Sequence, residues 1–186
     1  PKPCKPYDAT RDGITLGEAA AVVYVSKEAQ GAKAQLLGSS SINDANHISG
    51  PSRTGEGLYL SVQNALDEAK INPKQIDLIN AHGTATLYND EMESIAFMRA
   101  NLLSTPLNSY KGYFGHTLGT SGLLETLLTI ELAHYKTLLK SLNFETIGVS
   151  HPINILRETK NQEVNYILKT ASGFGGSNTA LVIKQL

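Results

Sequence analysis

Two histidines lie in loops rich in glycine and hydroxyl side chains. His82 lies in the stretch 80–86 (NAHGTAT), directly after the short apolar run 76–79, and His116 ends the stretch 111–116 (KGYFGH). Asp90 follows His82 by eight residues, near the expected start of a helix. A single histidine after a strand is more often structural than catalytic. The glycine, the hydroxyls and the carboxylate nevertheless favour a ligand site at the carboxyl end of a strand in an α/β sheet.

The residues around His116 predict a neutral imidazole. Lys111 precedes His116 by five residues, and a nearby cation disfavours protonation of a histidine ring. A neutral imidazole donates a hydrogen bond without carrying a net charge. Two such donors directed at one carbonyl oxygen would stabilise a developing enolate.

A third loop has the sequence GFGGSN at residues 173–178 and lies between the strand-like runs 165–171 and 179–184. It is either a plain glycine-rich hairpin or a loop whose backbone N–H groups line an oxyanion hole. It does not match a phosphate-binding loop, because no Lys-Ser/Thr pair follows and strands, not a helix, flank it.

The elements that would position these loops alternate along the chain. Apolar residues at helical spacing predict an amphipathic helix over 58–69. Asn89 or Asp90 is expected to cap a second helix, and a third, apolar nearly all round and therefore buried, follows 119–122. Strands are expected at the end of 14–25, covered on both faces, and at 32–39, 76–81, 107–109, 165–171 and 179–184. This order predicts a layered α/β domain with a mixed sheet.

Composition limits the possible functions. The chain has 186 residues, 41% hydrophobic and 18% charged, with a net charge of −1 and no basic stripe, which fits one globular domain, or half of a larger one, that binds no nucleic acid. A single cysteine, Cys4, excludes an internal disulfide and favours a reducing cytoplasm. No apolar run approaches the roughly 20 residues that cross a bilayer. The first residue is Pro1, so the chain is expected to begin inside a longer protein or after cleavage.

Taken together, these motifs resemble the C-terminal signatures of the β-ketoacyl-[acyl carrier protein] synthases, the elongating condensing enzymes of fatty-acid and polyketide synthesis. The resemblance rests on residues 80–86, 111–116 with 119–125, and 173–178, in this order, and the segments 4–8, 11–13 and 16–18 resemble the start of the second half of the family. It runs from residue 1 to residue 186. It implies one C-terminal thiolase-like domain over 1–186, a five-stranded mixed β-sheet layered with α-helices.

The resemblance also implies a reaction, the decarboxylative Claisen condensation of an acyl thioester with malonyl-carrier protein. It assigns roles to residues of all three loops and of the loop before the first long helix. His82 and His116 match the histidines that contact the malonyl thioester carbonyl, and Lys111 matches the lysine that supports them. Asp90 and Glu125 match carboxylates that order the site, and Phe174 with Gly175 matches the oxyanion hole and gate. Thr84 and Thr86 match residues of the pantetheine tunnel, and Asp44 and His47 match a mobile loop.

The family carries its acyl group on a cysteine of an N-terminal half that this sequence lacks. Cys4 is not that nucleophile, because it lies in a proline-rich segment without a helix start to lower its pKa and far from the nucleophile in the family pattern. The isolated chain is therefore expected to be inactive. The implied partners are acyl carrier protein, which brings its own phosphopantetheine so that no cofactor is needed, and the missing half, in a homodimer or heterodimer.

Two positions depart from the family pattern. Ser172 stands where the family usually has phenylalanine, and Leu87 replaces a proline. Ser172 is much smaller than phenylalanine and lies beside the expected gate, so the acyl chain length is not predicted.

Four rival functions stay open. A thiolase is disfavoured because its second cysteine is absent. A chain-length-factor-like partner, catalytically dead, is disfavoured because both histidines and Lys111 are retained. A metal site would use His82, His116, Asp90 and Glu125, but their spacing is not typical of one. A non-enzymatic carrier-protein docking module is the fourth.

Overall fold

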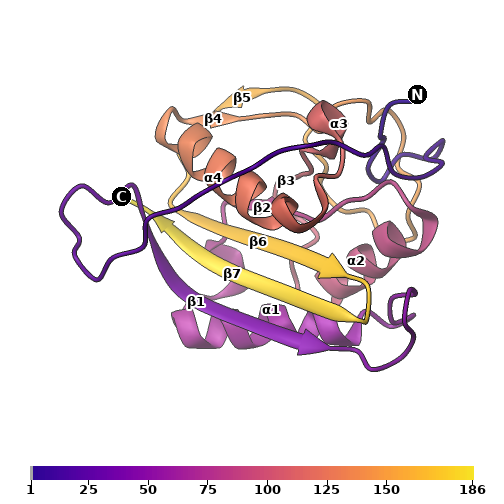
Figure 1. The fold of residues 1–186 in the computed structure, drawn as a ribbon, viewed down its shortest axis with the longest axis horizontal. Helices are drawn as coiled ribbons and strands as arrows, with labels where there is room; N and C mark the ends of the chain where they lie inside the picture. The colour runs from indigo at the N-terminus through magenta and orange to yellow at the C-terminus, as the bar shows by residue number, and fades with distance from the viewer. Residues whose placement is uncertain (1) are drawn as a thin grey trace.

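The computed structural model describes residues 2–186, so Pro1 and the expectation attached to it lie outside the described residues. A five-stranded mixed sheet forms the centre of the domain, in the order β1-β7-β6-β2-β3 (Figure 1). Its strands are β1 (Ala34–Asn43), β2 (Leu78–Asn80), β3 (Leu107–Asn108), β6 (Tyr166–Gly173) and β7 (Ser177–Gln185). β1, β7 and β6 are antiparallel neighbours, whereas β2 is parallel to both β6 and β3. The predicted mixed sheet is confirmed.

Helices cover both faces of this sheet. α1 (Glu56–Ala69) packs along β1 and β7 and contacts α2 (Leu87–Arg99), whereas α4 (Ser121–His134) contacts β2, β6 and β7 from the other side. The smaller elements are the one-turn helix α3 (Lys111–Phe114), the 3₁₀ turns η1 (Pro73–Gln75) and η2 (Leu118–Thr120), and the two-stranded sheet of β4 (Thr137–Leu138) and β5 (Lys160–Asn161). Within the described part of the chain, no helix is long and apolar enough to cross a membrane.

The core forms two clusters because side chains alternate across the central strands. Ile167 belongs to the cluster on the α4 side, and the next residue, Leu168, belongs to the cluster against α1 and α2. Leu78 and Ile79 on β2 divide in the same way. Successive side chains of a strand point to opposite faces of the sheet, so neighbouring residues of β6 reach opposite layers of the molecule.

The strand expected at the end of 14–25 does not form. Residues 17–25 make an extended segment that crosses α4 in Figure 1. Thr120, the residue before α4, donates its Oγ1 hydrogen to the Ala19 carbonyl (3.0 Å). Val22 and Tyr24 are 90% and 91% exposed. A strand needs neighbours for its backbone N–H and C=O groups, and none within residues 2–186 pairs with 22–25. Apolar, β-branched sequence without a partner strand leaves the segment irregular.

The sequence suggested that α4 is buried through its leucines, but the structure buries other residues. Its buried positions are Ser121, Glu125, Thr129 and Ala133, a stripe at spacing of four, whereas the leucines at 123, 124, 127 and 128 are half-exposed. The inward face is polar because Glu125 meets two buried lysines there. The inward face of this helix therefore combines a charged network at Glu125 with apolar packing at Ala133.

The start of α2 also differs from expectation. The residue before its first turn is Thr86, without a side-chain cap, and Asp90 lies inside the helix. Asp90 is buried and accepts hydrogen bonds from backbone N–H groups of two other segments. Its carboxylate therefore orders loops instead of capping its own helix.

Candidate active site

His82 is held by its backbone and by its ring. β2 ends at Asn80, and the following backbone N–H groups of His82 and Gly83 donate to the two carboxylate oxygens of Glu93 on α2 (2.9 and 2.7 Å). Lys111 Nζ donates to the His82 carbonyl (2.5 Å) and lies 3.4 Å from the ring Nδ1. Burial, with Lys111 beside the ring, lowers the pKa of His82 well below its usual value. The imidazole is therefore neutral at neutral pH.

Gly83 allows the His82 loop to approach the next strand. Its φ is +47°, in the left-handed region, and a Cβ at this position would lie 2.6 Å from Ser109 Cβ. Ser109 Oγ donates to the Gly83 carbonyl (2.9 Å). Only a residue without a side chain fits both the dihedral angle and the space.

Asp90 fixes the second part of the same loop. Its carboxylate accepts from the backbone N–H groups of Tyr7 (2.7 Å) and Thr84 (3.0 Å). Burial, with Glu93 nearby, raises the pKa of Asp90 to about 7. The hydroxyls of Thr84 and Thr86 are hydrogen-bonded to each other at 2.8 Å, so both predicted tunnel threonines lie together beside this carboxylate.

His116 follows the single turn of α3 and pairs with the N-terminal segment. Its N–H donates to the Thr15 carbonyl (2.7 Å), and its carbonyl accepts from the Gly17 N–H (3.0 Å). The Leu118 N–H donates to the ring Nδ1 (3.1 Å). Burial and then Lys111 lower the pKa of His116 to about 4, in the direction that the Lys111 spacing predicts.

The two imidazoles meet edge to face, with ring centroids 5.1 Å apart and planes at 82°. Each Nδ1 faces a donor, Lys111 Nζ for His82 and the Leu118 N–H for His116. A neutral ring that accepts at Nδ1 carries its proton on Nε2. The site therefore offers two uncharged Nε2–H donors side by side, an arrangement that can stabilise negative charge on one oxygen.

Beneath the rings, one carboxylate joins two lysines. Glu125 Oε1 lies 2.7 Å from Lys111 Nζ, and Glu125 Oε2 lies 2.5 Å from Lys169 Nζ on β6. Ser121 Oγ also donates to Oε1 (2.7 Å). Burial opposes ionisation of Glu125, but Lys169 and Lys111 hold the pKa of its carboxyl at about 2, so it is a carboxylate throughout the neutral range.

Sequence reasoning missed Lys169 and Glu93. Lys169 interrupts an otherwise apolar strand run, and Glu93 lies on the helix face that carries the buried Met92 and Ala96. A charged residue inside a buried pattern signals a paired or functional group, so both could have been found. Their partners, Glu125 and the His82 loop, are distant in sequence and needed the fold.

The glycine turn lies at the same sheet edge as the His82 loop, because parallel β2 and β6 both end there. Within residues 2–186, no hydrogen bond or ring pair joins Phe174 or Gly175 to either histidine. The Phe174 side chain is 82% exposed. The Gly175 N–H donates to the Ile48 carbonyl (2.6 Å), so it is not free to act as an oxyanion donor in this structure.

The turn instead contacts the loop that contains Asp44. The Asp44 N–H donates to the Gly176 carbonyl (2.8 Å), and its carboxylate accepts from the Gly57 N–H (2.8 Å). His47 is exposed and its ring closes its own turn. Of the residues that depart from the family pattern, Ser172 donates to Asn178 Oδ1 (2.9 Å), and Leu87 begins α2 with its side chain 60% exposed.

Cys4 is buried with its Sγ 3.6 Å from the Thr84 carbonyl oxygen, and burial raises the pKa of its thiol to about 11. A protonated thiol is a poor nucleophile, in agreement with the sequence argument against it. Among residues 2–186, no three histidine, cysteine, aspartate or glutamate side chains lie together as a metal site would require.

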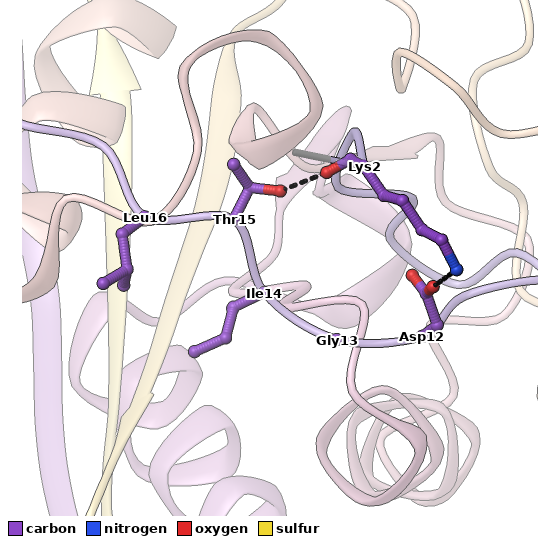
Figure 2. A pocket seen from close by; sticks show the side chains of 6 residues that line it. All are labelled: Lys2, Asp12, Gly13, Ile14, Thr15 and Leu16. Carbon is purple, nitrogen blue, oxygen red and sulfur yellow. Dashed lines mark hydrogen bonds and ion pairs between the residues drawn. The ribbon is translucent and has the colours of Figure 1, made fainter.

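A surface hollow lies along the N-terminal segment and not over the histidines. Figure 2 shows the Lys2–Asp12 ion pair (2.7 Å) and the Thr15 hydroxyl donating to the Lys2 carbonyl (2.7 Å). Ile14 and Leu16 point away from this pair. Leu16, which lines the hollow, forms a backbone bridge with His116. The hollow is therefore connected to the histidine site by the backbone of the N-terminal segment.

Comparison with known sequences agrees with this geometry. Residues 33–145 match the model of the β-ketoacyl synthase C-terminal domain. The chain is 32% identical over 97% of its length to a putative mitochondrial 3-oxoacyl-[acyl-carrier-protein] synthase of Schizosaccharomyces pombe, and 34% identical over 96% to a putative polyketide β-ketoacyl synthase of Streptomyces virginiae. It spans 46% and 45% of these proteins, about half the length of the relatives it matches.

Solved structures give the same result. A β-ketoacyl synthase from Burkholderia phymatum superposes with a TM-score of 0.88 at 34% identity, over 98% of this chain and 46% of that one. A ketosynthase in complex with its chain length factor from Xenorhabdus doucetiae gives 0.85 at 31% identity, over 100% and 47%. The fold is thiolase-like, and the chain belongs to the β-ketoacyl synthase family, of which it carries the C-terminal domain.

Proposed function

We propose that this chain supplies the histidine half of a decarboxylating β-ketoacyl-[acyl carrier protein] synthase, over the whole of residues 1–186. The observation that carries the proposal is the pair of neutral imidazoles, each with Nδ1 facing a donor and Nε2 free to donate. Two such donors fit the carbonyl oxygen of a thioester whose enolate must be stabilised.

In this mechanism, His82 and His116 donate from Nε2 to the thioester carbonyl of a malonyl group. The bond to the carboxylate carbon breaks, carbon dioxide leaves, and the electron pair forms the enolate. The enolate carbon attacks an acyl thioester, forms the new carbon–carbon bond and releases the thiolate that carried the acyl group. Lys111 and Glu125 hold His82, and the Phe174 N–H stabilises the second oxyanion.

The acyl-carrying thiolate comes from an N-terminal half. Cys4 does not supply it, because its thiol is buried and its pKa is raised. The chain spans less than half of its first relatives, and the exposed apolar residues Val22 and Tyr24 fit a surface covered by that missing half. We propose a homodimer or heterodimer in the assembled enzyme, as in the ketosynthase that is seen with its chain length factor.

Acyl carrier protein is the proposed donor of the malonyl group, by analogy with the acyl-carrier-protein synthase among the relatives. Its phosphopantetheine arm would pass Thr84 and Thr86, whose hydroxyls lie together beside His82. The substrate brings this arm, so the chain needs no cofactor of its own. The gate would be Phe174, with the loop of Asp44 and His47 moving with it.

The test measures β-ketoacyl-carrier protein by mass spectrometry from malonyl- and acyl-carrier protein. The 186-residue chain alone is expected to give no product, and the chain joined to an N-terminal half with its cysteine is expected to give product. Product from the chain alone would refute the half-site argument. An assembled protein that forms no product although both histidines are intact would point to a non-catalytic, chain-length-factor-like role or a carrier-protein docking module.

A further inference from the structure

Lys169 is a buried cation that the reaction described above does not use. It lies on β6 between strands β7 and β2, paired in register with Leu181 and Asn80, and is 2% exposed. Its neighbours Ile167 and Leu168 are apolar and fully buried. Burying an ammonium group is costly unless it is paired, so a lysine at this position needs a buried partner, which Glu125 supplies at 2.5 Å.

The lysine completes the partners of Glu125. Lys111 and Ser121 both occupy Glu125 Oε1, and Lys169 occupies Oε2. Without Lys169, the buried Oε2 has no donor, and the carboxylate can rotate or draw Lys111 to its other oxygen. Lys111 would then leave the His82 carbonyl and Nδ1. The position of Lys111, and through it the tautomer of His82, depends on both oxygens being occupied.

The three groups also carry a net charge. Lys111 and Glu125 alone would cancel, whereas Lys169 leaves one positive charge below the histidines. The titratable groups around the His82 loop and Glu125 come from five segments: Cys4, Tyr7 and Arg11 from the N-terminal segment, Asp90 and Glu93 from α2, Lys111 from α3, Glu125 from α4 and Lys169 from β6. Asp90 and Glu93 accept from backbone N–H groups, and Asp90 also lies 3.7 Å from Arg11. The carboxylate that pairs with Lys169 is therefore Glu125, which Lys111 already partners.

We propose that Lys169 is a positioning residue of the histidine site, which locks Glu125 and Lys111 in place and adds the positive charge that keeps both imidazoles neutral donors. The effect of Lys169 on the reaction rests on the proposed function, but its electrostatic effect on the histidines does not. The lowered pKa values of His82 and His116 are in accord, because Lys169 contributes to both. It follows burial and Lys111 for His82, and for His116 it follows burial, Lys111 and the opposing effect of Glu125.

The test titrates His82 and His116 by NMR in the histidine-labelled protein. Lys169→Met removes the charge and the donor, whereas Lys169→Gln removes the charge and keeps an amide donor for Glu125. Loss of a neighbouring cation is expected to raise both histidine pKa values by about one unit in either variant. Lys169→Arg, which keeps the charge, and Lys184→Met, which changes a half-buried lysine on β7, are expected to leave them within about 0.3 units.

Unchanged histidine titration in the folded Met or Gln variant would overturn the proposal, and so would an equal shift in Lys184→Met. If Lys169→Met does not fold, the Gln variant gives the answer. In the assembled synthase, the acidic limb of the rate profile is expected to move to higher pH with the histidine pKa. A histidine shift without any condensation activity in the wild type would refute the proposed function and leave the role of Lys169 standing.

Discussion

The rings of His82 and His116 meet at 82°, with 5.1 Å between their centroids, although the residues are 34 positions apart in the sequence. Their backbones are held by different segments, His82 by Glu93 of α2 and His116 by Thr15 of the N-terminal segment. The backbone of each histidine is therefore anchored separately, so either can be replaced without removing the backbone anchor of the other.

Replacing His116 by alanine is expected to slow decarboxylation more than acyl transfer. The ring supplies one of two donors to the enolate oxygen, and losing one such donor costs about 10²–10³ in rate. Carbon dioxide release and acyl loading, measured separately on the assembled synthase, give the comparison. His134→Ala, an exposed histidine on α4, is the control. Equal losses in both steps would contradict the role given to His116.

Glu125→Gln is expected to destabilise the fold by about 3–5 kcal/mol, because it leaves two buried ammonium groups without a counter-charge. Urea unfolding followed by circular dichroism measures the change. Glu131→Gln is the matched control on the same helix, where an exposed carboxylate pairs with Lys33 and contributes no more than about 1 kcal/mol. Similar losses in the two variants would show that the lysines do not need the carboxylate.

Acid is expected to weaken the fold through the histidines. Both histidine pKa values are lowered in the folded chain, that of His116 to about 4, so the unfolded chain binds more protons between about pH 6.5 and 4. The free energy of unfolding therefore falls as the pH falls through this range. The slope is at most about 1.4 kcal/mol per pH unit for each ring, and less for the half-buried His116 because solvent screens it.

The check compares the wild type with His116→Gln in urea titrations at several pH values. The variant is expected to lose less stability on acidification. Asp90 acts in the opposite direction, because its raised pKa of about 7 stabilises the fold at low pH and is lost as the pH rises; it is common to both proteins and cancels. Parallel stability curves would mean that His116 takes up its proton without cost to the fold.

Gly83→Ala is expected to displace the His82 loop and to destabilise the protein by about 1–3 kcal/mol. The added methyl group would meet Ser109 at 2.6 Å, on a backbone with φ of +47°. Thermal unfolding and the NMR shifts of the His82 ring give the readout. Gly119→Ala, where a Cβ meets nothing within 4 Å, is the control. An unperturbed His82 ring in the Gly83 variant would show that the loop can yield.

The sequence predicts the central sheet and α1 of this protein better than the orientation of α4. The central sheet, α1 and the hairpin of β6 and β7 follow from period and turn residues, and Lys111 lowers the pKa of His116 as its spacing indicated. Rotation of α4 could not be predicted, because a nearly all-apolar helix gives no preferred face and its orientation follows from Glu125 meeting Lys169 on a distant strand. The expected strand before Val25 failed because pairing needs a neighbour that residues 2–186 do not offer.

Lys169 and Thr170 are neighbours on β6, yet the first reaches Glu125 on α4 and the second contacts Glu93 on α2 at 3.4 Å. A strand that slips by one residue exchanges its two faces. Such a slip would turn the Lys169 ammonium into the apolar layer against α1 and present the Leu168 side chain to the Glu125 carboxylate. The register of β6 is therefore specified by charge, because a shifted strand would bury an unpaired ammonium group. The native register pairs Lys169 with Glu125.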